Sequence, residues 1–319
     1  MFASFRKAIT TVASGTTATT LKPMLDEAEL HNLYRRAHST SAHFQHPFIE
    51  QHQAGDVASR FRGSGMDYEE SRNYQPGDET RFINWRVTAR TGQAHIKQFR
   101  EETRPGVFIF VDHRISMRFG THARIKAAQA SRLTALIAFA AVQQGWTVSG
   151  LRLDDKTHWF PTSPDSHSIW QFVRESAGAC VPKEMLDAPS LISVLAQIQN
   201  QSVRGNHIYL ISDFADLTDE IKPHLLEMVN SHPVFALHVV DPVELALPDA
   251  GKMVLQDMTG ETTQQLDLSD SVVRERFKAR AKERQVTIQK QLHGCAYFQV
   301  LTDSKNPEKQ IPLPHGLGT

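Results

Sequence analysis

Short continuous apolar runs alternate with longer segments whose apolar residues recur every three or four positions, between about residues 104 and 303. The runs GVFIFVD at 106–112 and HIYLISD at 207–213 are typical of parallel strands that are covered on both faces. The segments 123–144 and 271–292 have the spacing and the length of helices. Alternation of this kind predicts an α/β fold with a doubly wound, mostly parallel sheet.

The same pattern divides the chain into five predicted parts. They are a disordered tail at 1–20, a helical or irregular extension at 21–59, a small N-terminal subdomain at 60–103, the α/β domain at 104–303 and a C-terminal tail at 304–319. Within the extension, Leu25, Leu30, Leu33 and Tyr34 are spaced like one face of a helix. The first twenty residues hold no acid and lack the apolar core of a secretory signal, so we interpret them as a tail.

Charge and cysteine content exclude several classes of function. Lys plus Arg and Asp plus Glu each number 35, so the molecule as a whole has no net attraction to nucleic acid or to an anionic membrane. The longest apolar run, 133–142, is far shorter than the roughly 20 residues of a membrane-spanning helix. Cys180 and Cys295 share no metal-binding or disulfide spacing. We therefore expect a cytoplasmic protein without a membrane partner.

Two of the predicted strands end in an acid, Asp112 after FIFV and Asp213 after IYLIS. Open α/β sheets bind ligands beyond the carboxyl ends of the strands, where the strand order reverses. If the chain returns to place its fourth strand beside its first, the two acids share one crevice, to which Ser116 adds a hydroxyl. Such an oxygen set suits a hard cation such as magnesium. The alternative is that each acid only caps the helix that follows it.

At this point the chain resembles two known patterns. The segment from Asp112 to Ser116, with Asp213 as a later acid, resembles the D-x-S-x-S metal-ion-dependent adhesion site of von Willebrand factor type A domains. The segment 71–102 is similar to the signature R-x-Y-x-x-G-D-x-x-R-x-I-x-W-x-x-S-A-R of the bacterial family called domain of unknown function fifty-eight. Its residues here are Arg72, Tyr74, Gly77, Asp78, Arg81, Ile83, Trp85, Ala89 and Arg90, with Thr88 at the serine position. The segment 241–251 is similar to a later family motif, D-P-x-E-x-x-L-P-x-x-G.

The resemblance implies a sheet of von Willebrand factor type A type and an interaction role without catalysis. The implied partners are a MoxR-type AAA+ ATPase, which the chain would serve as adaptor or substrate-recognition partner, and the client proteins of that ATPase. The implied metal ligands are Asp112, Ser116 and Asp213. A second loop normally adds a threonine, for which Thr162 is the best match.

Arg114 departs from the motif because it stands at the middle serine, and a guanidinium has no lone pair to give to a cation. We expect Arg114 to lie near the cation position and to neutralise Asp112 and Asp213 through charge-assisted hydrogen bonds. The metal site would then be degenerate, with no physiological metal and no cofactor. The alternative, a weakened magnesium site, requires Arg114 to swing out of the crevice.

The signature segment also has an interpretation from its own residues. Pro76 and Gly77 predict a turn at 75–78, because Pro sets one dihedral and Gly permits a positive one. We predict that the subdomain packs on the sheet and that Trp85 is buried as its anchor. A structural clamp is favoured for this segment, and a surface for a partner is the alternative.

Two further functions compete with the adaptor. The first is a metal-dependent hydrolase that uses Asp112 and Asp213, although the chain contains no GxSxG, HExxH or GxxxxGK[ST] motif. The second is nucleic-acid binding by the basic segment 271–292, whose Val273 and Phe277 predict instead a helix that faces the sheet and leaves its cations in solvent. Four histidines fit no zinc spacing and are interpreted as solvated: His38, His43, His46 and His52.

Overall fold

The computed structural model describes residues 7–8, 23–39, 66–75, 79–101, 105–180, 188–202, 205–257 and 263–314. These residues belong to two compact units, one formed by 1–52 with 105–319 and the other by 53–104. The second unit contains the predicted subdomain at 60–103. Some residues singled out above lie outside the described part of the chain: His43, His46, His52, Gly77, Asp78 and the side chain of Arg72.

The first unit is built on a six-stranded sheet with the order β11, β8, β7, β4, β5, β6. Its strands are β4 (Gly106–Asp112), β5 (Thr147–Leu153), β6 (Thr157–Ser163), β7 (His207–Ser212), β8 (Val234–Val240) and β11 (Ala296–Leu301). All neighbours pair in parallel except β5 and β6. The chain therefore runs outward from β4 to β6 and returns to place β7 on the other side of β4. The predicted doubly wound, mostly parallel sheet is confirmed.

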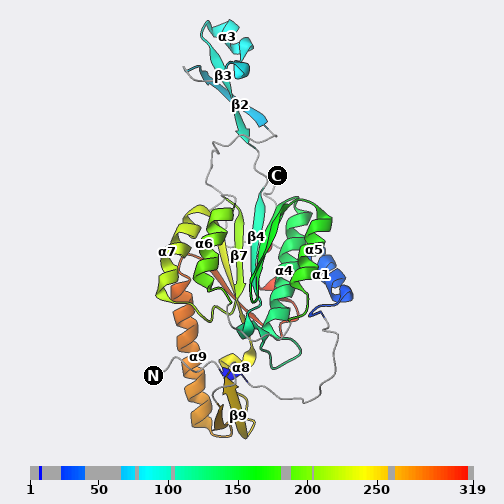
Figure 1. The fold of residues 1–319 in the computed structure, drawn as a ribbon, viewed down its shortest axis with the longest axis vertical. Helices are drawn as coiled ribbons and strands as arrows, with labels where there is room; N and C mark the ends of the chain where they lie inside the picture. Colours follow the sequence, from blue (N-terminus) through cyan, green and yellow to red (C-terminus); the bar gives the residue numbers. More distant parts are fainter. Residues whose placement is uncertain are drawn as a thin grey trace. The chain divides into compact units, whose positions relative to one another are not determined.

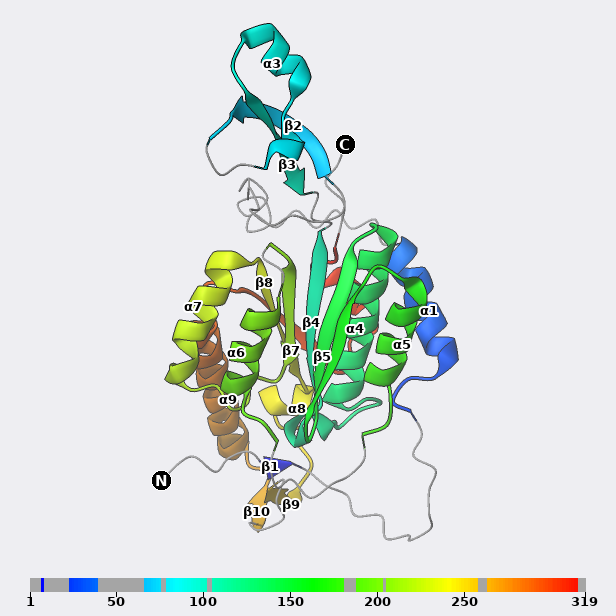
Figure 2. The ribbon, with the colours of Figure 1, turned by 45° about the horizontal axis from the view of Figure 1, so that its top comes forward.

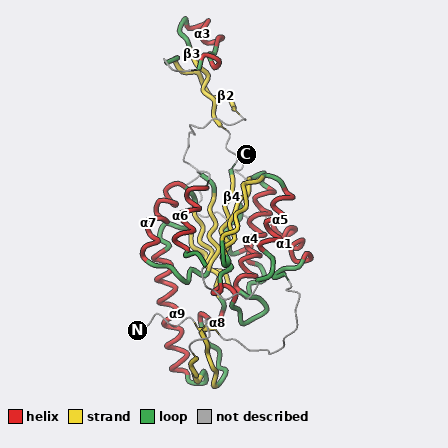
Figure 3. The backbone as a smooth tube through the Cα atoms, in the orientation of Figure 1, coloured by secondary structure: helices red, strands yellow, loops and turns green. Residues whose placement is uncertain are grey.

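Helices cover both faces of this sheet (Figures 1 and 3). One face carries α1 (Glu27–Ser39), α4 (Lys126–Gln143) and α5 (Ser166–Ser176), and the other carries α6 (Leu191–Gln201), α7 (Lys222–Ser231) and α9 (Ser271–Gln291). Residues 107–111 of β4 are all apolar because Val107 and Ile109 pack in the first layer, whereas Phe108 and Phe110 pack in the second. Among the described helices, none is both long and apolar enough to cross a bilayer.

Helix α1 is a helix within the predicted extension at 21–59, as the spacing of its apolar residues indicated, and it packs into the core. Leu30 and Leu33 of α1 are buried in the same apolar cluster as Leu133 and Phe139 of α4. The helix forms because its apolar residues recur at helical spacing, and two acids in its first turn favour its start. Figure 2 shows α1 on the outer side of α4 and α5.

Residues 304–314 also belong to the core, so the predicted tail at 304–319 is wrong for them. Ile311 and Leu313 are buried, and the Tyr209 hydroxyl donates a hydrogen bond of 3.1 Å to the carbonyl of Pro312. The short helix η4 (Pro307–Lys309) precedes them. An extended Ile-Pro-Leu-Pro stretch has no periodicity that would reveal its burial in the sequence.

A second, antiparallel sheet has the order β1 (Lys7–Ala8), β9 (Lys252–Asp257), β10 (Thr263–Asp267). Strands β9 and β10 pair antiparallel, with Val254 opposite Gln265. The backbones of Lys7 and Ala8 pair with β9, so these two residues are not in a disordered tail. The remaining short elements of the first unit are η2 (Ile115–Arg118), η3 (Asp219–Ile221) and α8 (Pro242–Leu245).

The second unit contains β2 (Met66–Asn73), η1 (Thr80–Phe82), α3 (Trp85–Thr91) and β3 (His95–Glu101), with β2 and β3 paired antiparallel. Trp85 is 70% exposed, so the prediction that it is buried as an anchor is wrong. The reason is the direction of the short helix α3: Val87 and Thr88 are its half-buried residues, and Trp85 lies on the opposite side. Ile96 of β3 is the buried apolar residue of the described part of this unit.

Candidate functional site

The site lies where the strand order reverses, at the carboxyl ends of β4 and β7. These strands are parallel neighbours, with Val111 opposite Ile211, so Asp112 and the loop after Ser212 emerge at the same edge of the sheet. Asp112 is 0% exposed and Asp213 is 5% exposed. The predicted proximity of the two acid-bearing strand ends is confirmed by this topology.

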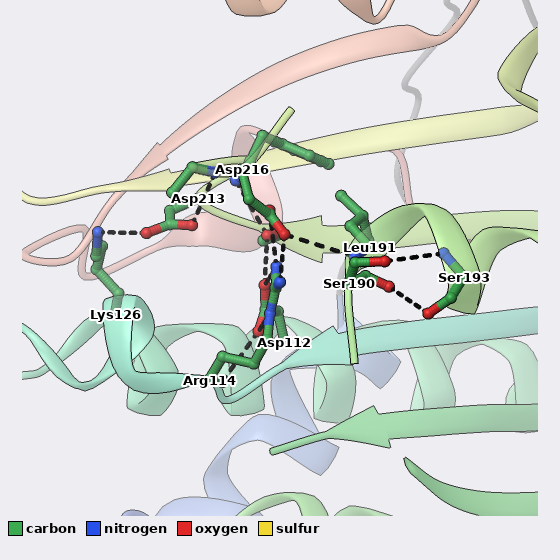
Figure 4. Close-up of polar contacts among 11 residues, drawn as sticks. Asp112, Arg114, Lys126, Ser190, Leu191, Ser193, Asp213 and Asp216 are labelled. Atoms are coloured by element: carbon green, nitrogen blue, oxygen red, sulfur yellow. Dashed lines mark hydrogen bonds and ion pairs between the residues drawn. The ribbon is translucent and has the colours of Figure 1, made fainter. Parts of the chain in front are cut away.

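Arg114 lies between two carboxylates and binds both as a fork (Figure 4). Its Nε and Nη2 donate to Asp112 Oδ1 and Oδ2 at 3.0 and 2.7 Å. Its Nη1 and Nη2 donate to Asp216 Oδ2 and Oδ1 at 2.5 and 3.0 Å. Two-pronged pairing of this kind fixes both the position and the plane of the guanidinium.

The pKa values follow from this geometry. Burial opposes the charge of Arg114, but Asp112 and Asp216 outweigh it and raise the pKa of the guanidinium above its usual range. Burial likewise acts to raise the pKa of Asp216, and the hydrogen bonds and charge of Arg114 reverse this, so the pKa of Asp216 lies below its usual value. Arg114 and Asp216 are therefore both charged at neutral pH and form a stable ion pair.

Asp112 is saturated by further donors. Ser212 Oγ donates to its Oδ2 at 2.7 Å, and the Arg114 backbone N–H donates to its Oδ1 at 3.0 Å. Together with the guanidinium, these bonds give each carboxylate oxygen two donors. A buried carboxylate in this state has no lone pair directed at an additional ligand.

A second buried cation, Lys126, neutralises Asp213. Lys126 is 2% exposed, and its Nζ donates to Asp213 Oδ2 at 2.9 Å and to Glu244 Oε1 at 2.8 Å. Burial acts to lower the pKa of the ammonium, but Asp213 and Glu244 overcome it and raise that pKa. The prediction that Arg114 would neutralise Asp213 is therefore wrong. Arg114 forms ion pairs with Asp112 and Asp216, whereas Asp213 forms an ion pair with Lys126.

The D-P-x-E motif connects this second pair to the rest of the fold. Asp241 caps α8, and the Glu244 side chain accepts a bond from the Asp241 backbone N–H in a capping box. Asp241 also accepts from Thr121 of the loop before α4 and from Thr302 after β11. Although burial acts to raise the pKa of Asp241, these hydrogen bonds lower it. The motif thus holds three loops of the carboxyl edge together.

Two other predicted ligands do not join the cluster. Ser116 is half-buried in η2, and within the described part of the chain no hydrogen bond connects its hydroxyl to Asp112 or Asp213. Thr162 lies at the opposite end of the sheet, because its neighbour Ser163 pairs with Val148 at the start of β5, so its assignment as a ligand is wrong. The second loop at the cluster is the one before α6, where the Leu191 backbone N–H donates to Asp216 at 3.5 Å.

These residues do not fit the divalent cation of a metal-ion-dependent adhesion site. Arg114 and Lys126 donate to the very carboxylates that would ligate the ion. A cation placed there would face two positive charges and lose the serine oxygen that Arg114 replaces. Within the described residues, no three His, Cys, Asp or Glu side chains are grouped so that they could hold a metal ion.

Lys126 and Asp216 are the site residues that sequence reasoning missed. A signal existed for Lys126, because a cation in the first turn of an apolar helix opposes the helix dipole and needs a compensating partner. Asp216 follows Asp213 by three residues in a loop, where side-chain direction follows no periodicity. Only the folded loop shows that Asp216 turns toward Arg114.

The strand order and the position of the site define the first unit as a sheet of von Willebrand factor type A type, with paired side-chain cations at the site. A family model described as Protein of unknown function DUF58 matches residues 70–287. The chain belongs to this bacterial family, as the signature and the D-P-x-E motif predicted. Uncharacterized proteins of Mycobacterium bovis and Mycobacterium tuberculosis are each 27% identical to it over 242 residues, which cover 76% of this chain and 75% of the relative.

Two solved structures are similar to the chain at low identity. The conserved hypothetical protein BatB from Bacteroides thetaiotaomicron is 15% identical, with a TM-score of 0.40, and the match covers 64% of this chain and 93% of that chain. An aerotolerance-related membrane protein from Bacteroides fragilis is 16% identical, with a TM-score of 0.42, and the match covers 64% of this chain and 94% of that chain. Neither similarity carries information about the function of this chain.

Proposed function

We propose that this protein is a non-enzymatic interaction domain of the cytoplasm that serves a MoxR-type AAA+ ATPase as adaptor or substrate-recognition partner. The chain contributes binding and not chemistry. Its carboxyl edge is a rigid scaffold in which Arg114 and Lys126 take the place of a metal. The partner ATPase supplies the energy of nucleotide hydrolysis, for which the chain has no phosphate-binding loop of its own.

The observation that carries this proposal is the forked contact of Arg114 with Asp112 and Asp216. A hydrolase of this fold would need carboxylates that are available to a metal, a water molecule or a substrate proton. Here Asp112 and Asp213 each have a buried cation as partner, and their removal from that partner would leave a buried charge unpaired. An arrangement of this kind favours a fixed binding scaffold over a catalytic centre.

The direct test is a binding measurement between the purified full chain and the purified MoxR-type ATPase of the same bacterium. We expect a complex whose affinity differs between ATP, ADP and nucleotide-free conditions, because the binding of an adaptor is coupled to the nucleotide state of the ATPase. The matched control is another AAA+ ATPase of that bacterium. The proposal is contradicted by the absence of binding in every nucleotide state. A magnesium-dependent hydrolytic activity that requires Asp112 and Asp213 contradicts it as well.

A further inference from the structure

Helix α3 of the second unit presents an exposed face that no contact within its own unit explains. Besides Thr91 at its end, four residues of the helix are exposed: Trp85, Arg86, Ala89 and Arg90. At about 100° per residue they fall within one arc of roughly 140°, with Trp85 next to Ala89 and Arg86 next to Arg90. Figure 2 shows α3 beside the β2–β3 hairpin of the same unit.

The other side of α3 is fixed to β3, so the exposed face has a defined direction. Asn84 caps the helix by accepting from the Val87 N–H at 3.3 Å, and its own N–H donates to the His95 carbonyl at 2.7 Å. Thr88 Oγ1 accepts from the His95 N–H at 3.0 Å. Gly92 ends the helix with a φ of 73°, a left-handed conformation that glycine adopts without a steric penalty. The helix is therefore held at both ends.

The composition of this face is not explained by the stability of the helix. A tryptophan that is 70% exposed leaves a large apolar surface in water. Arg86 lies in the first turn, where a cation opposes the helix dipole, and α3 has no acid in that turn. Only Arg90, in the last turn, is favoured by the dipole. Trp and Arg are the residue types most enriched among energetically dominant interface residues.

We infer that this α3 face docks on an acidic protein surface, with Trp85 inserted in an apolar pocket whose rim carries carboxylates for Arg86 and Arg90. The partner surface should be acidic because, within the described residues, the α3 face holds two guanidinium groups and no acid. Among the described ion pairs, none joins an acid of the second unit to Arg86 or Arg90. The inference rests on the proposed function, because it assigns this contact to the same AAA+ ATPase.

The test compares variants of the full chain in binding to the purified ATPase. Trp85→Ala is expected to weaken binding by at least about 30-fold, the loss typical of a dominant interface residue. Arg86→Glu with Arg90→Glu is expected to weaken it by at least about tenfold and to reduce its dependence on salt. The matched control is Arg276→Glu with Arg284→Glu on the exposed side of α9, which changes the charge equally and is expected to alter affinity less than about threefold.

The possible outcomes separate the two proposals. If the parent binds the ATPase and the α3 variants bind equally well, this inference fails and the proposed function stands. If the parent does not bind, both fail. A clear drop in the melting temperature of Trp85→Ala means that Trp85 is buried by its own chain and overturns the inference. Tight binding of single-stranded oligonucleotide that requires Trp85 and displaces the ATPase assigns the face to nucleic acid and overturns it too.

Discussion

Arg114 and Asp216 are joined by two hydrogen bonds, of 2.5 and 3.0 Å, although they come from the loops after two different strands. The side chain of Arg114 is 9% exposed and that of Asp216 is 31% exposed. Because the same guanidinium also holds Asp112, this contact ties the loop after β7 to the loop after β4. The pair thus joins two loops that a metal ion would otherwise have to join.

Asp216→Asn should lower the free energy of unfolding by about 1–3 kcal/mol at pH 7, because Arg114 loses one of its two charged partners. The pKa of Asp216 is lowered in the folded protein, so its contribution is present above the unfolded pKa and is lost as pH falls through the folded value. The difference between parent and variant should therefore shrink below about pH 4. Urea unfolding at pH 7 and pH 3.5 checks this.

The control for that experiment is Asp249→Asn, whose carboxylate is 67% exposed and lies 3.4 Å from Arg274. A solvated ion pair of this kind contributes about 0–1 kcal/mol, so the variant should resemble the parent at both pH values. Equal effects of the two substitutions would contradict the role given to Asp216.

The core position of α1 predicts a strong effect of Leu33→Ala. Leu33 is 1% exposed, so its truncation should cost about 2–5 kcal/mol through lost burial and an added cavity. Leu226 of α7 is 59% exposed, and Leu226→Ala should change stability by less than about 0.5 kcal/mol. If Leu33→Ala melts like the parent, α1 does not form part of the core.

Gly150 of β5 should not tolerate a side chain. A Cβ at this position would lie 2.5 Å from Phe172 Cζ and 2.8 Å from the Ile109 carbonyl oxygen. Gly150→Ala should therefore destabilise the protein by about 1–3 kcal/mol through overpacking. The double variant with Phe172→Leu should recover part of the loss, because the leucine removes the ring atoms that clash. A thermal melt of the three proteins checks the order, and a Gly150→Ala protein as stable as the parent would disprove the close packing.

Buried histidines should make the protein sensitive to mild acid. Burial lowers the pKa of His238 to about 4, with Asp213 opposing and the charges of Lys126 and Arg284 adding to the effect. Since the unfolded value is about 6.5, the unfolded state binds the proton first, and stability should fall by about 1.4 kcal/mol per pH unit between about 6.5 and 4.

The variant that isolates this effect is His238→Phe. It is expected to lose stability at pH 7, because Tyr297 loses its bond to the ring, and to show a shallower fall toward pH 4.5. His293 is exposed, and His293→Asn should keep the slope of the parent. This explanation is contradicted if His238→Phe leaves the pH dependence of the free energy of unfolding unchanged.

The architecture of the sheet was predictable because each strand carries its signal locally. Residues 107–111 of β4 and 208–211 of β7 are all apolar, since both faces of the sheet are covered, and the helices between them have their own periodicity. Adjacency of Asp112 and the loop after β7 then followed from the return of the chain to the first strand. The prediction that Trp85 is buried was wrong, because the size and apolarity of a side chain do not show which side of a short helix faces inward.

The pairing inside the site was only half predictable. The sequence indicates that Arg114 removes an oxygen ligand and adds a charge, and this follows from residue chemistry alone. The sequence does not indicate that the second carboxylate bound by Arg114 is Asp216 and not Asp213, because side-chain direction in a loop follows no sequence periodicity. Lys126 shows the same limit: it is distant in sequence from Asp213 and reaches it only through the packing of α4 on the sheet.

The central claim is that Arg114 substitutes for a metal ion. Its most direct test is the melting temperature of the parent, Arg114→Ser and Arg114→Lys, each with and without millimolar magnesium. We predict no magnesium effect on the parent. Arg114→Ser should be less stable without metal, by about 3–5 kcal/mol, because Asp112 remains buried without its cation.

With magnesium, Arg114→Ser should regain stability, because the serine restores the D-x-S-x-S spacing and a ligand stabilises the fold in proportion to its binding; the gain is about 1.4 kcal/mol at ten times the Kd. Arg114→Lys keeps the charge and should gain nothing. A parent protein whose melting temperature rises with magnesium, and loses that rise on Asp112→Asn, would contradict the account.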